Sequence, residues 1–190
     1  MIYVLDNFLD DHVLEIQLNK LLDNTFDEYV AGDKSFYAQI PDHEFDEYVV
    51  NLIQKQERNT IKKIFSFFRV STDVLDNDWR IHSDLNIMGN RPDRAAVLYI
   101  SPKTLTKLNG TAFWHHELYG KELPSYVNDE EYDRVLLKDS NDLSKWNLSS
   151  VVGYEQNRLV SYPSNYFHSK YPNQSQKSGR IVYVIFYNIN

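Results

Sequence analysis

The feature that most constrains the fold is the change of pattern near Ile61, where helical segments give way to a long β-rich region. From there on, short runs of β-branched and aromatic residues alternate with turn-rich segments, at residues 64–70, 95–101, 159–162, 166–170 and 180–187. The last run is nearly all apolar but too short to cross a membrane as a helix. Strands of this kind after a helical start predict an α+β fold, mainly β, with helices packed on one face of a double-sheet β core.

Two amphipathic helices are expected ahead of this region, after a short strand at residues 2–5. Asp10 or Asp11 can cap the first helix. Its apolar side comprises Val13, Leu14, Leu18, Leu21 and Leu22. The second follows Pro41 and Asp42, and its apolar side comprises Phe45, Tyr48, Val49, Leu52 and Ile53. Short strands are expected between the two, and neither helix carries residues that suggest chemistry.

The segment at about 117–146 interrupts the β pattern. It holds eight acidic residues against four basic ones and shows no strand periodicity. We expect it to be an acidic insertion or lid, with a short helix around residues 129–137. An acidic lid would disfavour DNA and suit a neutral or basic peptide.

Composition narrows the chemistry. The 190 residues, 42% of them hydrophobic, are enough for a real core and predict a single domain spanning 1–190. Cysteine is absent, which excludes disulfides, thiol nucleophiles, iron–sulfur clusters and cysteine-ligated zinc. A net charge of −7 disfavours nucleic acid as a partner. The N-terminal segment resembles no secretory signal, so we expect a cytoplasmic protein without a membrane partner. Oligomeric state is left open.

A His-x-Asp pair, His82 and Asp84, is the first candidate for chemistry. On a strand this spacing places both side chains on one face, with Ser83 pointing away. His168, in another strand-like run, is the best candidate for a third ligand. Two histidines and one carboxylate on one face of an octahedron are typical of non-haem Fe(II) oxygenases. The pair alone is weak evidence, since roughly one His-x-acid pair is expected by chance in such a composition.

His115 and Glu117 form a second such pair and could replace the first in the triad. The alternative for His115 or His116 is a place on the substrate side of a pocket or on the surface. His12 and His43 lie at helix starts, where they should be solvated. A separate group of aromatic residues should belong to the core or to a pocket wall: Trp79, Phe113 and Trp114.

Arg180 lies twelve residues after His168, at the head of the last apolar strand. The alternating residues Val182, Val184 and Phe186 share its face. A guanidinium that points inward from such a face needs an anionic partner. This partner is either a structural carboxylate at the edge of the core or the carboxylate of a bound substrate or cosubstrate.

Taken in order, these motifs resemble the Fe(II)- and 2-oxoglutarate-dependent oxygenases of the prolyl 4-hydroxylase-like group, whose fold is the double-stranded β-helix, or jelly roll. The resemblance covers the chain except for about 117–146. It rests on the opening strand and helix, His82-x-Asp84, the strand 97–101 with Tyr99, the segment 109–113, the closing run 157–163, His168, and Arg180 after Ser178 and Gly179. The segment 109–113 departs from the group in having one glycine, Gly110, in place of two.

The resemblance implies a function and a set of site residues. His82, Asp84 and His168 would hold Fe(II), and Arg180 would pair with the distal carboxylate of 2-oxoglutarate, with a hydrogen bond from Tyr99. The catalytic residues would be His82, Asp84, His168 and Arg180. Dioxygen would be consumed, succinate and CO2 released, and a C–H bond hydroxylated, with ascorbate as a supporting reductant. Asp84 favours hydroxylation, since halogenases of the wider superfamily lack this carboxylate.

The substrate implied first is a protein or peptide, including a prolyl residue, by analogy alone. The alternative within the class is a free amino acid or another small molecule. An alternative from another class is a cupin-like metal-binding or isomerase module without oxygenase activity, which would leave Tyr99 and Arg180 without a role.

Overall fold

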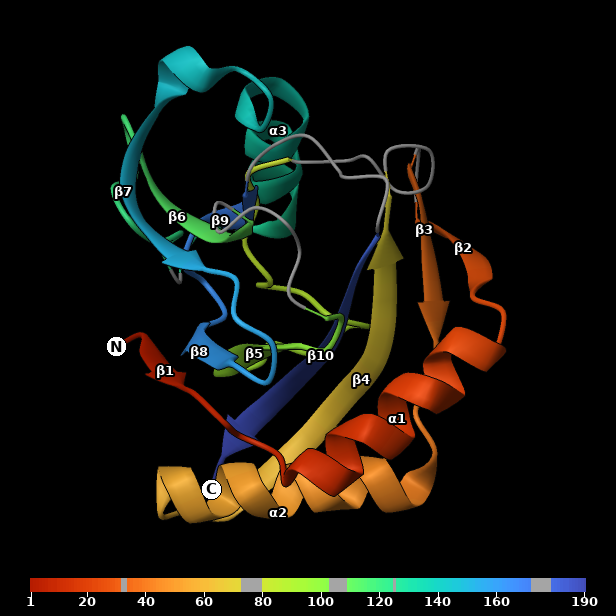
Figure 1. The fold of residues 1–190 in the computed structure, drawn as a ribbon. Coiled ribbons are helices and arrows are strands. Elements are labelled where there is room, and N and C mark those ends of the chain that lie inside the picture. Colours follow the sequence, from red (N-terminus) through yellow and green to blue (C-terminus); the bar gives the residue numbers. More distant parts are fainter. Residues whose placement is uncertain (32–33, 73–79, 103–108, 125, 172–178) are drawn as a thin grey trace.

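The computed structural model describes residues 1–31, 34–72, 80–102, 109–124, 126–171 and 179–190. Two antiparallel sheets form its centre (Figure 1). The strands of the seven-stranded sheet, in spatial order, are β1 (Tyr3–Leu5), β8 (Leu159–Pro163), β5 (Arg94–Tyr99), β10 (Arg180–Ile189), β4 (Ile61–Ser71), β3 (Lys34–Gln39) and β2 (Asp27–Ala31). The three-stranded sheet contains β7 (Trp146–Gly153), β6 (Gly110–His116) and β9 (His168–Tyr171). The expected fold class, a mainly β jelly roll with N-terminal helices, is confirmed.

Both expected helices form and pack on the outer face of the large sheet. They are α1 (Asp11–Asp23) and α2 (His43–Glu57), which lie beside β4 in Figure 1. Asp42 caps α2, since its side chain accepts a hydrogen bond from the Phe45 amide at 2.8 Å. The prediction that Leu22 lies on the buried side of α1 is wrong, because its side chain is 63% exposed. Gln17 is buried on that side instead. The buried stripe of α1 runs through positions 14, 17, 18 and 21, and Leu22 lies one step of about 100° beyond it.

The central strands of the large sheet separate two cores by simple alternation. On β10, Ile181, Tyr183 and Ile185 face the helices, whereas Val182 and Phe186 belong to the core between the sheets. Strand β4 alternates in the same way, with Phe68 toward the helices and Phe67 toward the inner core. The inner face of this sheet therefore forms one wall of the space between the two sheets.

The segment 117–146 packs against the small sheet around a third apolar cluster. The expected helix is present as α3 (Asp129–Asp139), followed by the 3-10 turn η1 (Leu143–Lys145). Leu123 and Val127 are fully buried and pack with Phe167 next to β9. The segment is thus anchored by its own apolar residues, despite its charge. Among the described residues, no helix is long and apolar enough to cross a membrane. Trp79 and Ser178 lie outside the described residues.

Candidate metal centre

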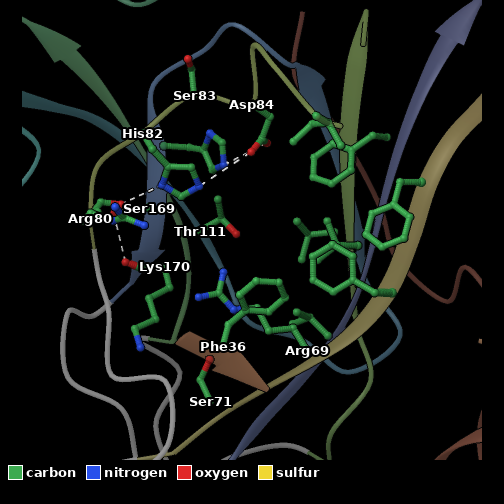
Figure 2. Close-up of a pocket in the computed structure, with 18 of the residues that line it drawn as sticks. Phe36, Arg69, Ser71, Arg80, His82, Ser83, Asp84, Thr111, Ser169 and Lys170 are labelled. Atoms are coloured by element: carbon green, nitrogen blue, oxygen red, sulfur yellow. Dashed lines mark hydrogen bonds and ion pairs between the residues drawn. The ribbon is translucent and has the colours of Figure 1, made fainter. Parts of the chain in front are cut away.

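His82, Asp84 and His168 come together in the structure, as the sequence predicts. One ligand atom from each lies within 4.8 Å of the others. The Nε2 atom of His168 is 3.3 Å from Asp84 Oδ2, and that of His82 is 3.8 Å from Asp84 Oδ1. Figure 2 shows the carboxylate turned toward the imidazole rings and Ser83 pointing away from them. For ligand bonds of about 2.1 Å, neighbouring ligands of an octahedral ion lie about 3 Å apart, so the spacing suits one metal ion.

The strand expected at His82 and Asp84 is reduced to a single bridge. His82 and His168 exchange two backbone hydrogen bonds, at 3.0 and 2.8 Å, and their ring centroids lie 4.5 Å apart. The Asp84 amide donates to the Ser164 carbonyl at 2.7 Å. Regular strand pairing is unnecessary here, since the His82–His168 bridge and the hydrogen bond from Asp84 to Ser164 set the positions of the three side chains.

Backbone carbonyls orient both imidazoles for metal binding. The Nδ1 atom of His82 lies 2.9 Å from the Arg80 carbonyl, and that of His168 lies 2.9 Å from the Tyr166 carbonyl. A carbonyl only accepts, so each Nδ1 carries a hydrogen, and Nε2 is the atom of each ring that can bind a metal ion. Burial and the neighbouring His168 ring lower the pKa of His82 to about 3, which keeps His82 neutral.

The burial of Asp84 makes its charged form costly. Burial raises the pKa of Asp84, while the positive charges that His168 and Arg69 can carry act against the rise. A buried carboxylate beside two imidazole nitrogens is stabilised by a divalent ion that binds all three donors. The donor set and its electrostatics therefore fit Fe(II) or a similar divalent metal.

A cavity of about 540 Å³ adjoins the triad between the two sheets. Its wall on the large sheet is formed by the inner faces of β4 and β10, with Phe67 and Val184 among its apolar residues. This volume is within the range of about 300–1,000 Å³ that small-molecule sites occupy. The cavity is the space in which a metal-bound ligand would lie.

Arg180 lines the same cavity and lies toward its other end. Its Nη2 atom is 3.3 Å from the Gly110 carbonyl, and Gly110 is three residues along β6 from Phe113, the partner of His168. At about 3.3 Å per residue, the two ends are about 10 Å apart along the strand. The Nε atom of Arg180 is buried and has no hydrogen-bond partner among the described residues. This orphaned donor is what an anionic ligand would satisfy.

Tyr99 lies beside Arg180 but behind the cavity wall. Its side chain is fully buried, its ring is 5.3 Å from the Arg180 guanidinium, and its hydroxyl is 2.8 Å from Thr111 Oγ1. Burial raises the pKa of Tyr99, so the hydroxyl keeps its proton. Thr111 lines the cavity and was missed by the sequence reasoning, although it lies within the motif segment 109–113.

The rival pair does not join the triad. His115 is exposed, and Glu117 pairs with Lys145 at 2.6 Å. The surface, one of the two places expected for His115 or His116, is where His115 lies, whereas His116 is neither on the surface nor among the residues that line the cavity. It is buried, with Nε2 3.1 Å from Asp139 Oδ2 and its ring 4.6 Å from that of Trp146. His116 thereby joins β6 to the end of α3.

Four other residues named from the sequence lie where they were expected, two in the core and two in solvent. Phe113 and Trp114 are buried, and Trp114 donates from Nε1 to Ser169 Oγ at 3.0 Å. His12 and His43 are exposed at the start of their helices, as expected.

Two cavity residues carried no signal in the sequence. Tyr132, on α3, lines the cavity, and its hydroxyl donates to the carbonyl of Ser83, the residue between the two adjacent ligands. Arg69, on β4, lines the opposite wall, with its guanidinium 5.7 Å from the Phe36 ring. In the sequence, Arg69 is one residue in a Phe-rich strand, and Tyr132 is one residue in a charged helix.

A jelly roll that joins a His-x-Asp pair to a histidine on the opposite strand is the arrangement found in 2-oxoglutarate-dependent oxygenases, and comparison with solved structures gives the same fold. HygX from Streptomyces hygroscopicus, with nickel, 2-oxoglutarate and hygromycin B bound, matches with a TM-score of 0.62 and 12% identity over 100% of this chain and 83% of its own. The non-haem alpha-ketoglutarate-dependent carbocyclase SnoK from nogalamycin biosynthesis matches with a TM-score of 0.67 and 12% identity, over 98% and 78%.

A third similar structure is a prolyl hydroxylase in complex with a hypoxia-inducible factor peptide from Trichoplax adhaerens. It has a TM-score of 0.61 and 12% identity, over 99% of this chain and 83% of its own. No protein-family model and no curated protein sequence matches the chain. At these identities the likeness establishes the fold alone.

Proposed function

We propose that this protein is an Fe(II)- and 2-oxoglutarate-dependent oxygenase that hydroxylates a C–H bond of its substrate. The observation that carries the proposal is the placement of the His82–Asp84–His168 triad and the orphaned Arg180 Nε at two ends of one cavity. Iron with 2-oxoglutarate and dioxygen supplies the oxidation of the C–H bond, with release of succinate and CO2.

The residues of the chain bind and orient. His82, Asp84 and His168 would hold the metal ion beside the cavity, where a ligand of the metal could reach it. Arg180 binds the distal carboxylate of 2-oxoglutarate through charge-assisted hydrogen bonds. Tyr99 and Thr111 position this end of the cosubstrate, since their hydroxyls are bonded to each other beside the guanidinium. The span of about 10 Å along β6 suits a metal ion followed by an extended five-carbon dicarboxylate.

Water exclusion comes from the apolar wall. Phe65, Phe67, Val182, Val184 and Phe186 line the cavity on the side of the large sheet. A dry wall strengthens the electrostatic contacts inside the cavity and protects a reactive site from solvent. Tyr132 closes the triad on the side of α3 by its hydrogen bond to the Ser83 carbonyl.

The test is formation of succinate by the purified chain with Fe(II), ascorbate, 2-oxoglutarate and air. Slow uncoupled formation is expected without added substrate, and Asp84→Ala should abolish it while Arg134→Gln, on the exposed face of α3, leaves it unchanged. Full activity of Asp84→Ala would refute the triad. Metal binding without any binding of 2-oxoglutarate would favour a cupin-like metal module instead.

A further inference from the structure

A strip of aromatic rings lines the cavity along β3, β4 and β10. The ring centroids of Phe36 and Phe67 are 5.8 Å apart, and those of Phe67 and Phe65 are 5.4 Å apart. Phe186 on β10 joins them, with its ring 6.4 Å from that of Phe67. All four residues line the cavity, so their rings form a continuous apolar surface on its wall. We call these four residues the aromatic strip.

One end of the aromatic strip is connected to the metal triad across the sheet. Phe65 pairs with Phe186 in the β4–β10 ladder. Ala95 pairs with Phe186 on one side and with Tyr162 on the other. Residues that pair directly in antiparallel strands point to the same face, so these four form one row on the inner face of the sheet. The Tyr162 ring lies 4.6 Å from the His168 ring, so this row leads from the triad to Phe65.

The aromatic strip extends away from the residues that we assign to the cosubstrate. The sheet order is β5, β10, β4, β3. Arg180 is on β10 and Tyr99 is on β5. Phe65 and Phe67 are on β4, and Phe36 is on β3. Figure 2 shows Phe36 on the side of the cavity away from the triad. A cosubstrate held on the side of β5 would therefore leave the rings on β4 and β3 uncovered.

The protein itself does not cover these rings completely. Phe36, Phe65 and Val184 are only partly buried, although they lie on the inner face of the sheet and line the cavity. The polar residues of β4 that line the cavity, Arg69 and Ser71, already interact within the protein. Apolar surface is therefore what β4 offers to a ligand, and covering such surface with an apolar molecule is favourable.

We propose that the substrate is a small, uncharged molecule with an apolar ring, which packs against the aromatic strip and presents a C–H bond to the metal. The inference rests on the proposed function and names its substrate class. The reaction is unchanged: the C–H compound, 2-oxoglutarate and dioxygen give the hydroxylated compound, succinate and CO2. A small molecule is favoured over a peptide because β3 and β4 each pair with a strand on both sides, which gives a peptide backbone no edge to pair with. The cavity volume of about 540 Å³ also suits a small molecule.

The test uses indole as the probe, because it is a flat and neutral ring. The readout is the valine methyl signals of the 13C-labelled protein, loaded with redox-inert Zn(II) and saturating 2-oxoglutarate. The Val184 signal, assigned by its loss in Val184→Ile, should shift saturably with indole and not with xylose, a polar molecule of similar size. Loss of one ring contact predicts at least threefold weaker indole binding in Phe65→Leu. Tyr126→Leu, which removes an exposed ring outside the cavity, should bind indole like the wild type.

Failure of this inference differs from failure of the proposed function. Wild-type protein that does not bind 2-oxoglutarate refutes the function. Protein that binds 2-oxoglutarate but shows no saturable shift with indole, or equal indole affinity in a folded Phe65→Leu, refutes only the role of the aromatic strip. Loss of 2-oxoglutarate binding in a folded Phe65→Leu would place the strip in the cosubstrate site and overturn the inference. If Phe65→Leu does not fold, Phe36→Leu carries the same comparison at the other end of the strip.

A series of indole derivatives tests the charge and the size of the ligand. Neutral indole-3-ethanol is compared with anionic indole-3-acetate and cationic tryptamine, which carry the same ring on a side chain of similar length. The neutral compound should bind most tightly, and tighter binding of either ion would overturn the uncharged part of the inference. A capped tripeptide with a central tryptophan carries the ring on a peptide. It should bind more weakly than indole-3-ethanol, and equal or tighter binding would overturn the small-molecule part.

Discussion

Replacing Arg180 separates a ligand-binding arginine from a structural one. Its Nε is buried without a hydrogen-bond partner among the described residues, and its described contacts are the Gly110 carbonyl at 3.3 Å and the face of Tyr99. No carboxylate among the described residues forms an ion pair with it. Arg180→Gln should therefore leave the unfolding temperature of the ligand-free protein unchanged or raise it slightly, because it removes a partly buried cation whose Nε is unsatisfied.

Cosubstrate binding should respond much more strongly. Truncation of one partner of a buried, charge-assisted pair costs about 2–5 kcal/mol, which is roughly 30-fold to a few thousand-fold in Kd. Arg180→Lys keeps the charge but loses the planar fork, so we expect an intermediate Kd. The assay is calorimetric titration of 2-oxoglutarate into Mn(II)-loaded protein, with Arg134→Gln as control. A Kd within twofold of the wild-type value for Arg180→Gln, or a large fall in its unfolding temperature, would refute the reasoning.

Three further predictions concern the metal, the lid and the close contact of two strands. Mn(II) at about 100 times its Kd should stabilise the fold by about 2.7 kcal/mol, or roughly 5–11 °C in a thermal melt, and Asp84→Ala should lose this shift. Tyr132→Phe removes the bond to the Ser83 carbonyl and should cost about 0.5–1.5 kcal/mol, with faster amide exchange along α3; unchanged exchange would contradict the tether. Gly110→Ala should cost about 1–3 kcal/mol in urea unfolding, because an added Cβ would overlap the Val152 carbonyl; wild-type stability would contradict the close contact.

The helices and strands were predictable from the sequence where their apolar residues follow one clear pattern. Strand β10 was recognisable because every residue from 181 to 187 is apolar or aromatic and both faces are buried. Helix α2 was recognisable because Val49 and Ile53 repeat toward a single sheet. Strand β7 was not predicted, since its exposed stretch mixes polar Asn147, Ser149 and Ser150 with apolar Leu148 and Val151 without regular alternation, and only pairing with β6 defines it.

The site was predictable where position in the chain implies position in space. His82, Asp84 and His168 follow from spacing and from the order of the motifs, and the structure brings them together. Arg69 and Tyr132 do not follow, because each depends on which face of its element turns toward the cavity and on how distant segments pack. Only tertiary contacts carry that information.

The central claim is one metal and one 2-oxoglutarate in a single cavity. A crystal structure of the protein with Mn(II) and 2-oxoglutarate, using the anomalous signal of manganese, tests it most directly. The account predicts one anomalous peak bound by His82 Nε2, His168 Nε2 and a carboxylate oxygen of Asp84, with the distal carboxylate of the cosubstrate on Arg180. A peak elsewhere, or a cosubstrate whose distal carboxylate lies away from Arg180, would contradict it.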